Sequence, residues 1–245
     1  MLQYIYIAIH SYGLMATIGV IVAMSYMYYK SITTDKYYIP FKDYLILCLF
    51  CIVGCLLGSK ALFTITQLPK LINAFSFSNL LQVTLMGGFV FYGGLFGALI
   101  GNILFSKIKK YNLNDIMDFT IPAFVIFHAF GRIGCFLSGC CYGFKLSNPL
   151  VIGIAHLNYF PIQLIEALFE FVMFFVLIRK VSDGNKFKIY LISYSTFRFL
   201  IEFFRGDETR GIWLGLSTSQ WISIVIIILV AFVSIKHIFF IKRRN

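Results

Sequence analysis

The stretch HAFGRIGCFLSGCCYG, residues 128–143, ends an apolar run that begins near residue 116 and is long enough to cross a bilayer. It places His128 and Arg132 where the surrounding sequence is otherwise suited to hydrocarbon. A charged side chain at such a depth costs about 3 kcal/mol or more, so it must face a protein interior or a watery cavity. The stretch therefore predicts a transmembrane helix in which Arg132 holds something anionic.

The composition of the whole chain is that of a membrane protein. Its 245 residues are 60% hydrophobic and only 13% charged, which argues against a soluble fold. Apolar runs of nearly membrane-spanning length cover residues 4–28, 44–66, 85–106, 116–137, 161–178, 188–204 and 219–240, the fifth and sixth being the shortest. We therefore expect an all-α integral membrane protein of about seven transmembrane helices, forming a single polytopic domain over residues 1–245.

The net charge of +11 follows the predicted loops. If the N-terminus is outside, the inward segments carry Lys30, Lys36, Lys42, Lys107, Lys109, Lys110, Arg179, Lys180, Lys186, Lys188, Lys236, Lys242, Arg243 and Arg244, and the outward ones only Lys70, Lys145, Arg205 and Arg210. The positive-inside rule then predicts an outside N-terminus and a cytoplasmic C-terminus, without any nucleic-acid partner. The first segment lacks a basic n-region and a cleavage site, so we expect a retained helix in a bacterial cytoplasmic (inner) membrane.

Ionisable residues inside the predicted spans recur at helical spacing. His128 and Arg132 share one helix face, and Glu166 and Glu170 share another. Arg132 has no acid three or four residues away. Its partner is therefore one of these glutamates, another distant acid, a backbone carbonyl or a bound anion.

The sixth span has an ionisable group of its own. Arg198 and Glu202 are four residues apart and can neutralise each other as an intrahelical ion pair, or they can contribute to a site. Arg205 can equally be an interfacial residue whose charged head reaches water.

Glycines and tyrosines suggest further contacts. Gly93, Gly97 and Gly101 form small-xxx-small frames, which indicate close helix packing. The tandem Gly93-Gly94 also predicts a loosened helix whose backbone amides can approach a ligand. Tyr12 and Tyr92 are either buried hydroxyls with a partner or ligand contacts. Two glutamines near outer helix ends, Gln163 and Gln220, can cap helices or donate to a lipid headgroup.

The cysteines form two groups. Cys48, Cys51 and Cys55 lie inside the second span at packing positions, whereas Cys135, Cys140 and Cys141 lie at the outer end of the fourth. The second group lacks metal-ligand spacing such as C-x2-C, so we predict no metal site. A disulfide, a reactive thiol and simple packing remain open for it.

Six motifs in order resemble the prolipoprotein diacylglyceryl transferase family. They are HSYGL at 10–14, FYGGLFG at 91–97, GRIGCFLSG at 131–139, PIQLIE at 161–166, FRFLIEFFR at 197–205 and SQWIS at 219–223. The resemblance covers nearly the whole chain and implies a seven-span fold with the N-terminus outside. It also implies transfer of a diacylglyceryl group from phosphatidylglycerol to the lipobox cysteine of a prolipoprotein, leaving a thioether and releasing glycerol phosphate. No cofactor is expected.

The resemblance also implies site residues. A phosphate leaving group needs fixed cations, and the family's two key arginines correspond to Arg132 and Arg198. Residues expected to bind substrate are Tyr12, His10, Gly93, Gly94, Gly131, Gly134, Cys135, Gly143, Gln163, Glu202 and Arg205.

The chain departs from the family pattern at several positions. Tyr92 replaces the histidine before the paired glycines, Cys135 stands where the signature has asparagine, Phe160 replaces a second histidine and Lys60 an arginine. We predict that His128, one turn before Arg132, or Tyr92 in a relay, replaces the missing base and so counts as catalytic. The alternatives are a divergent member with another acceptor and a non-catalytic transporter or binding protein for anionic lipid.

Overall fold

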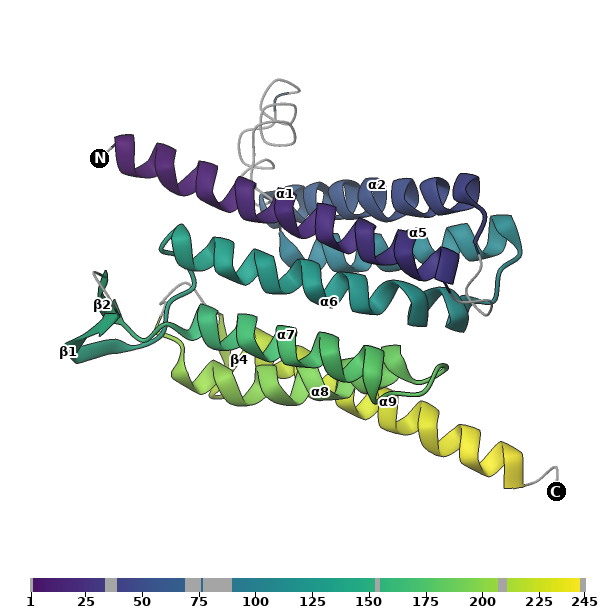
Figure 1. The fold of residues 1–245 in the computed structure, drawn as a ribbon. Coiled ribbons are helices and arrows are strands. Elements are labelled where there is room, and N and C mark those ends of the chain that lie inside the picture. Colours follow the sequence, from purple (N-terminus) through teal and green to yellow (C-terminus); the bar gives the residue numbers. More distant parts are fainter. Residues whose placement is uncertain are drawn as a thin grey trace. The chain divides into compact units, whose positions relative to one another are not determined.

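The computed structural model of the chain describes residues 2–33, 39–68, 76, 90–152, 155–206 and 211–242. Its helices are α1 (Leu2–Thr33), α2 (Phe41–Thr66), α5 (Phe91–Lys109), α6 (Leu113–Leu137), α7 (Ile162–Arg179), α8 (Lys186–Ile201) with the 3-10 turn η2 (Glu202–Phe204), and α9 (Thr218–Lys242) (Figure 1). Within the described residues, each of the seven predicted apolar runs coincides with one of these long helices. The prediction of a helical protein is therefore confirmed.

The apolar surface identifies a membrane protein. Within the described residues, three helices are long and apolar enough to cross a bilayer, over Ser11–Thr33, Phe41–Thr66 and Leu113–Leu137. The segment Thr218–Phe232 of α9 is a shorter apolar helix. Large apolar side chains stand exposed along these helices, as Leu57 does at 66%. Because soluble proteins do not expose apolar surface on this scale, the helices require a lipid environment.

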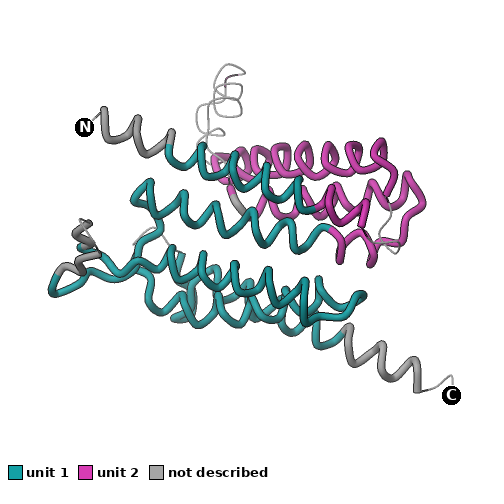
Figure 2. Tube along the Cα trace, viewed as in Figure 1, with its two compact units in different colours: residues 1–26, 120–245 teal, residues 27–119 magenta. Residues whose placement is uncertain are grey.

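The fold divides into two compact units (Figure 2). Unit 1 comprises residues 1–26 and 120–245, and unit 2 comprises residues 27–119. Unit 1 therefore contains α7, α8 and α9 with most of α1 and α6, whereas unit 2 contains α2 and α5. The single domain expected over residues 1–245 stays a prediction.

Unit 2 is built on direct backbone contact between α2 and α5. A Cβ atom added at Gly97 would overlap the carbonyl oxygen of Gly54, and one added at Gly93 would overlap that of Gly58. Only glycine permits such an approach, so the predicted role of the small-xxx-small frames in helix packing is confirmed. At one end of the pair, Lys109 Nζ of α5 lies 2.7 Å from Asp43 Oδ1 of α2.

The apolar core of unit 1 joins α6, α7 and α8. Val125 of α6 and Leu177 of α7 are fully buried, and Tyr190 of α8 is 3% exposed. Phe169 of α7 and Phe197 of α8 stack with ring centroids 4.0 Å apart. These contacts fix the helix faces that carry the charged residues.

The starts of α7 and α9 follow from local sequence. Pro161 is the N-cap of α7, where the missing N–H is not needed by the helix. Before α9, Gln220 N donates to Ser217 Oγ at 3.2 Å, while Ser217 N donates to Gln220 Oε1 at 2.9 Å. This reciprocal capping box confirms the predicted capping role of Gln220.

Two antiparallel hairpins interrupt the helices of unit 1. β1 (Lys145–Ile152) pairs with β2 (Ala155–Tyr159) through Lys145 opposite Tyr159, and β3 (Ile212–Trp213) pairs with β4 (Leu216–Ser217). Leu214 and Gly215 both have positive φ, as a tight hairpin turn requires. Neither hairpin was predicted, because the segments are short and lie outside the apolar runs.

Candidate active site

Two pairs of polar residues meet between α6 and α7. Arg132 Nε lies 3.1 Å from Glu166 Oε2, and His128 Nδ1 lies 2.8 Å from Glu170 Oε1. On each helix the two residues are four apart, so they lie one turn apart on the same face, and the two faces meet at the interface. The acids that sequence spacing left open as partners of Arg132 thus have separate roles, because Glu166 pairs with the arginine and Glu170 with the histidine.

Glu166 also binds the second arginine of the predicted site. Arg198 Nη1 of α8 donates to Glu166 Oε1 at 2.6 Å, and Arg198 Nη2 lies 2.8 Å from Glu202 Oε2. The same Nη2 donates to Ser219 Oγ of α9 at 3.4 Å. One buried carboxylate therefore bridges two guanidinium groups, and the intrahelical pair of Arg198 with Glu202 is present as predicted.

The two arginines differ in how many of their side-chain nitrogens are left without a protein partner and can bind a ligand. Arg198 is 5% exposed and has both terminal nitrogens in contact with the protein. Within the described part of the chain, Arg132 forms one ion pair, from Nε to Glu166 at 3.1 Å without hydrogen-bond geometry, and no acceptor is found for its two terminal nitrogens. Planar guanidinium donors in this arrangement suit a phosphate oxygen pair.

The charge balance of the cluster is positive. Arg205 Nη1 lies 3.8 Å from Glu202 Oε2, so three arginines gather around the carboxylates of Glu166 and Glu202. In a low-dielectric site, an excess positive charge favours a bound anion. The geometry therefore supports an anion site centred on Arg132.

His128 lies one turn deeper than Arg132 in a polar network of its own. Its side chain is 4% exposed, and the Tyr190 hydroxyl donates to Glu170 at 3.0 Å and lies 3.5 Å from His128 Nδ1. Contact with Glu170 favours the proton on Nδ1 and orients the ring. The catalytic role of His128 stays a prediction.

Segments that follow, precede or lie within three of the predicted motifs meet in backbone hydrogen bonds at one end of unit 1. Gly143 N donates to Phe160 O at 2.9 Å, and Phe144 N donates to Phe204 O at 3.0 Å. Gly143 also forms a β-bridge with Arg205, and a Cβ added to it would lie 2.7 Å from Phe160 O. Close backbone packing thus requires glycine here and joins the motifs that end at residues 143 and 205 to the start of α7.

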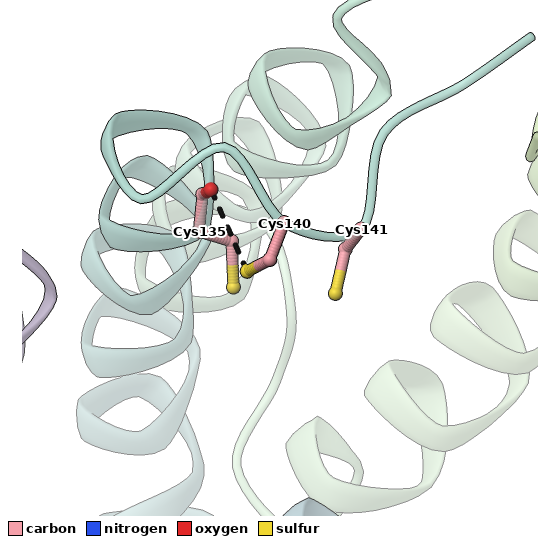
Figure 3. Close-up of side chains that lie close together, drawn as sticks. All are labelled: Cys135, Cys140 and Cys141. Atoms are coloured by element: carbon pink, nitrogen blue, oxygen red, sulfur yellow. Dashed lines mark hydrogen bonds between the residues drawn. The ribbon is translucent and has the colours of Figure 1, made fainter. Parts of the chain in front are cut away.

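The three outer cysteines lie together where α6 ends. Cys140 Sγ is within hydrogen-bonding range of Cys135 O at 3.6 Å, and the sulfur atoms of Cys135, Cys140 and Cys141 lie within 4.8 Å of one another (Figure 3). Hydrogen bonds from the Cys135 and Cys140 thiols lower the pKa of Cys141, and the charges of nearby arginines act in the same direction. From α7, Gln163 Nε2 donates to Cys140 O at 2.6 Å.

Comparison of the chain with known proteins shows its family. A family model described as prolipoprotein diacylglyceryl transferase matches residues 1–236. The chain belongs to this family. It is 32% identical over 92% of its length to a phosphatidylglycerol–prolipoprotein diacylglyceryl transferase of Clostridium tetani, of which 92% is covered. It is also 33% identical over 90% of its length to transferase 2 of Clostridium perfringens, of which 88% is covered. The resemblance drawn from the six motifs is confirmed.

Three other residues expected from the transferase family, Tyr12, Gly131 and Gly134, lie in unit 1 near Arg132. Tyr12 of α1 packs on Gly134 of α6, where an added Cβ would lie 3.1 Å from the tyrosine ring. Gly131 is different, because a Cβ added there would meet no described atom within 4 Å. Gly131 thus immediately precedes Arg132 in α6, and Tyr12 lies on α1 beside Gly134, which is two residues after Arg132. The side chain of His10 lies outside the described residues.

Three predicted residues of the transferase site belong to unit 2. Tyr92, Gly93 and Gly94 form the first turn of α5, which is helical from residue 91. Gly93 and Gly94 pack on α2, where Cβ atoms would meet Gly58 and Ser59. The loosened helix expected at the tandem glycines is therefore wrong for the described residues 91–109, and substrate contact by all three stays a prediction.

Two residues that contact the arginines were not among the predicted site residues, although Glu166 was named as one candidate partner of Arg132. Glu166 bridges Arg132 and Arg198, and the Ser219 hydroxyl oxygen accepts a hydrogen bond from Arg198 Nη2. The signal for Glu166 was a pair of acids four apart in an apolar run. Ser219 had no comparable signal, because a serine near a helix start is ordinarily a cap.

Proposed function

We propose that the chain transfers the diacylglyceryl group of phosphatidylglycerol to the lipobox cysteine of prolipoproteins, the first step of lipoprotein maturation. Membership of the transferase family over residues 1–236 is the observation that carries this proposal. The relatives from both clostridia are named for this lipid donor and this protein acceptor. A partly buried arginine whose terminal donors have no protein acceptor supports the same reaction, because the donor lipid contains one phosphodiester.

The phosphate of phosphatidylglycerol binds the terminal nitrogens of Arg132 in this proposal. Glu166 holds the Nε edge of that guanidinium, so the forked donors are directed away from the carboxylate. Arg198 holds Glu166 in turn and adds positive charge close to the phosphate. Preorganised cations of this kind stabilise the charge that develops on a leaving phosphate ester.

The reaction exchanges one bond for another. The thiolate sulfur of the prolipoprotein cysteine attacks the C3 carbon of the diacylglyceryl group, forming a carbon–sulfur bond. The bond between that carbon and the phosphate oxygen breaks, and glycerol phosphate leaves with the electron pair. The thiol proton must go to a base, because an unperturbed cysteine with a pKa of about 8.5 is mostly protonated at neutral pH.

His128 is our candidate for this base, with Tyr92 as a possible relay. The contact between His128 and Glu170 supports a proton acceptor in the same helix as Arg132, one turn away. We expect His128→Ala to lower transfer to a lipobox peptide by roughly 100-fold, the usual range for general-base loss. Full activity in both His128→Ala and Tyr92→Phe would eliminate this assignment while leaving the phosphate site untouched.

The remaining predicted residues extend this site toward the two substrates. Tyr12, Gly131, Gly134, Cys135 and Gly143 are proposed to border the acceptor and the lipid headgroup. Tyr12 beside Gly134 supports this assignment, as does the open space at Gly131. The family resemblance assigns six further residues to the substrates: His10, Gly93, Gly94, Gln163, Glu202 and Arg205.

We further propose a multi-pass protein of the bacterial inner membrane with seven spans, an outside N-terminus and a cytoplasmic C-terminus. The distribution of Lys and Arg over alternate loops supports this topology. Reporter fusions after residues 36, 110, 183 and 245 should all report cytoplasm, and fusions after residues 70, 146 and 208 the outside. A fusion on the opposite side at any of these places would revise the span count.

Two assays test the proposed activity. The full chain should restore growth of a bacterium depleted of its own diacylglyceryl transferase, and mass spectrometry should find a diacylglyceryl thioether on a reporter lipobox cysteine. Purified protein should also release glycerol phosphate from phosphatidylglycerol only when the peptide is present. Release with a different acceptor would favour a divergent activity, and lipid binding without release would favour a non-catalytic protein.

A further inference from the structure

The sulfur atoms of Cys135, Cys140 and Cys141 form a cluster to which the proposed reaction gives no role as a set, although Cys135 itself is proposed to border the substrates. All three cysteines are free thiols, and their sulfur atoms lie within 4.8 Å of one another. In Figure 3 the three side chains point to the same side of the chain segment that leaves α6. The backbone around the cluster explains why the three thiols lie together, and their chemistry indicates what they can bind.

The local cause is a tight reversal of the chain after α6. Gly139 and Cys141 both adopt left-handed conformations, with φ of 67° and 58°. Cys140 N donates to Cys135 O at 3.1 Å, which folds the segment back over the last turn of the helix. The left-handed conformation costs a residue with a side chain about 1 kcal/mol, so Cys141 is held there by its surroundings.

A contact from a second helix secures this reversal. Gln163 of α7 is 2% exposed, and its Nε2 donates to Cys140 O at 2.6 Å. The segment carrying Cys140 is thus fixed from both α6 and α7. The thiols are therefore positioned before any ligand arrives, which lowers the entropic cost of binding one.

The chemistry of three gathered thiols is that of a soft-metal site. Zinc-type cations bind cysteine sulfur at about 2.3 Å, which places the sulfur atoms of one site roughly 4 Å apart. The cluster needs only a small movement to reach that spacing. Cys140 is exposed, so a cation can enter from solvent and keep a water molecule as a fourth ligand.

We propose that Cys135, Cys140 and Cys141 bind one zinc-type thiophilic cation through three sulfur ligands. Binding releases the thiol protons to solvent as each sulfur becomes a thiolate ligand. The inference does not rest on the proposed transferase activity, because metal binding is measured directly. A failure of either proposal leaves the other standing.

The test uses the full chain, purified in detergent with reductant and freed of metal. We expect Zn²⁺ titrated alone to bind at one ion per chain, and Cd²⁺ to give a thiolate charge-transfer absorption of the same stoichiometry. Each of Cys135→Ser, Cys140→Ser and Cys141→Ser should weaken binding at least about tenfold. Bound Zn²⁺ should also protect Cys140 from alkylation, as followed by peptide mass spectrometry.

Cys55→Ser is the matched control, since Cys55 is a half-buried thiol of α2. It should bind Zn²⁺ as tightly as the unaltered chain. Equal loss in this control, substoichiometric binding, or a disulfide within the cluster in the reduced, metal-free protein would overturn the proposal. Size-exclusion profiles and circular dichroism identify a variant that has failed to fold, and the alkylation measurement on the unaltered chain then decides alone.

Discussion

The α6–α7–α8 interface of unit 1 and the α2–α5 interface of unit 2 solve the same packing problem in opposite ways. The first is joined by buried ion pairs around Glu166, and the second by glycines whose backbones touch. Glycine contacts leave no charged group available for chemistry. Ion pairs keep charged groups inside the protein, but the loss of one partner leaves the other as an unpaired buried charge.

The difference assigns separate tasks to the two interfaces. Removing one partner of a buried ion pair costs about 3–5 kcal/mol, because an uncompensated charge stays behind. Adding a methyl group to a filled interface costs about 1–3 kcal/mol. The polar interface is therefore the more vulnerable one, and it is also where Arg132 has donors left for a ligand.

The largest effect should come from Glu166→Ala. This change leaves the buried Arg198 and the partly buried Arg132 without their shared carboxylate, and we expect a loss of about 3–5 kcal/mol in the free energy of unfolding. Thermal unfolding in detergent measures it.

Asp43→Asn is the matched control in unit 2. The Asp43–Lys109 pair is 20% and 28% exposed, so water screens it and its loss should lower the unfolding temperature much less than Glu166→Ala does. Equal unfolding temperatures for Glu166→Ala and Asp43→Asn would show that Glu166 is not the electrostatic centre of the interface.

The next effect should be catalytic and confined to the polar interface. Arg132→Lys keeps a positive charge beside Glu166 but loses the forked donors, so the fold should persist while transfer falls roughly 100-fold. The measurement is the initial rate of diacylglyceryl transfer to a lipobox peptide at saturating lipid. An unchanged rate would contradict the role given to the terminal nitrogens of Arg132.

The smallest effect should appear at the glycine interface. Gly97→Ala introduces a Cβ against the carbonyl oxygen of Gly54 and should lower the free energy of unfolding by about 1–3 kcal/mol. Gly13→Ala is the control, because a Cβ there meets no described atom within 4 Å and, inside helix α1, should raise stability by about 0.5–1 kcal/mol through helix propensity alone. If the two variants unfold alike, backbone contact does not hold α2 and α5 together.

Much of this architecture was predictable from periodic patterns. Long apolar runs predicted every long helix described, since hydrocarbon forces the backbone to satisfy its own hydrogen bonds. Glycines four apart predicted a tight helix pair, and Arg198 with Glu202 predicted an ion pair within one helix turn. These features depend on residues close together in the chain.

Other features were not predictable because they depend on how distant segments meet. Spacing left the partner of Arg132 open among Glu166, Glu170, another distant acid, a backbone carbonyl and a bound anion, and only the packing of α6 on α7 showed that Glu166 contacts it. The two hairpins were missed, because strands of two to eight residues carry little periodic signal. The tandem glycines were interpreted as a loosened helix, whereas packing against α2 accounts for them in the described helix.

The sequence by itself determined the family, the helices and the presence of costly charges within apolar runs. Each of these is local, because it follows from hydropathy, helical spacing or ordered motifs. The tertiary structure decided which carboxylate holds each cation, why Gly143 must be glycine, and that three cysteines without metal-ligand spacing share one place. Those outcomes arise from contacts between α6, α7 and α8 and from a left-handed turn, and the physical forces that fix them act across long separations in the chain.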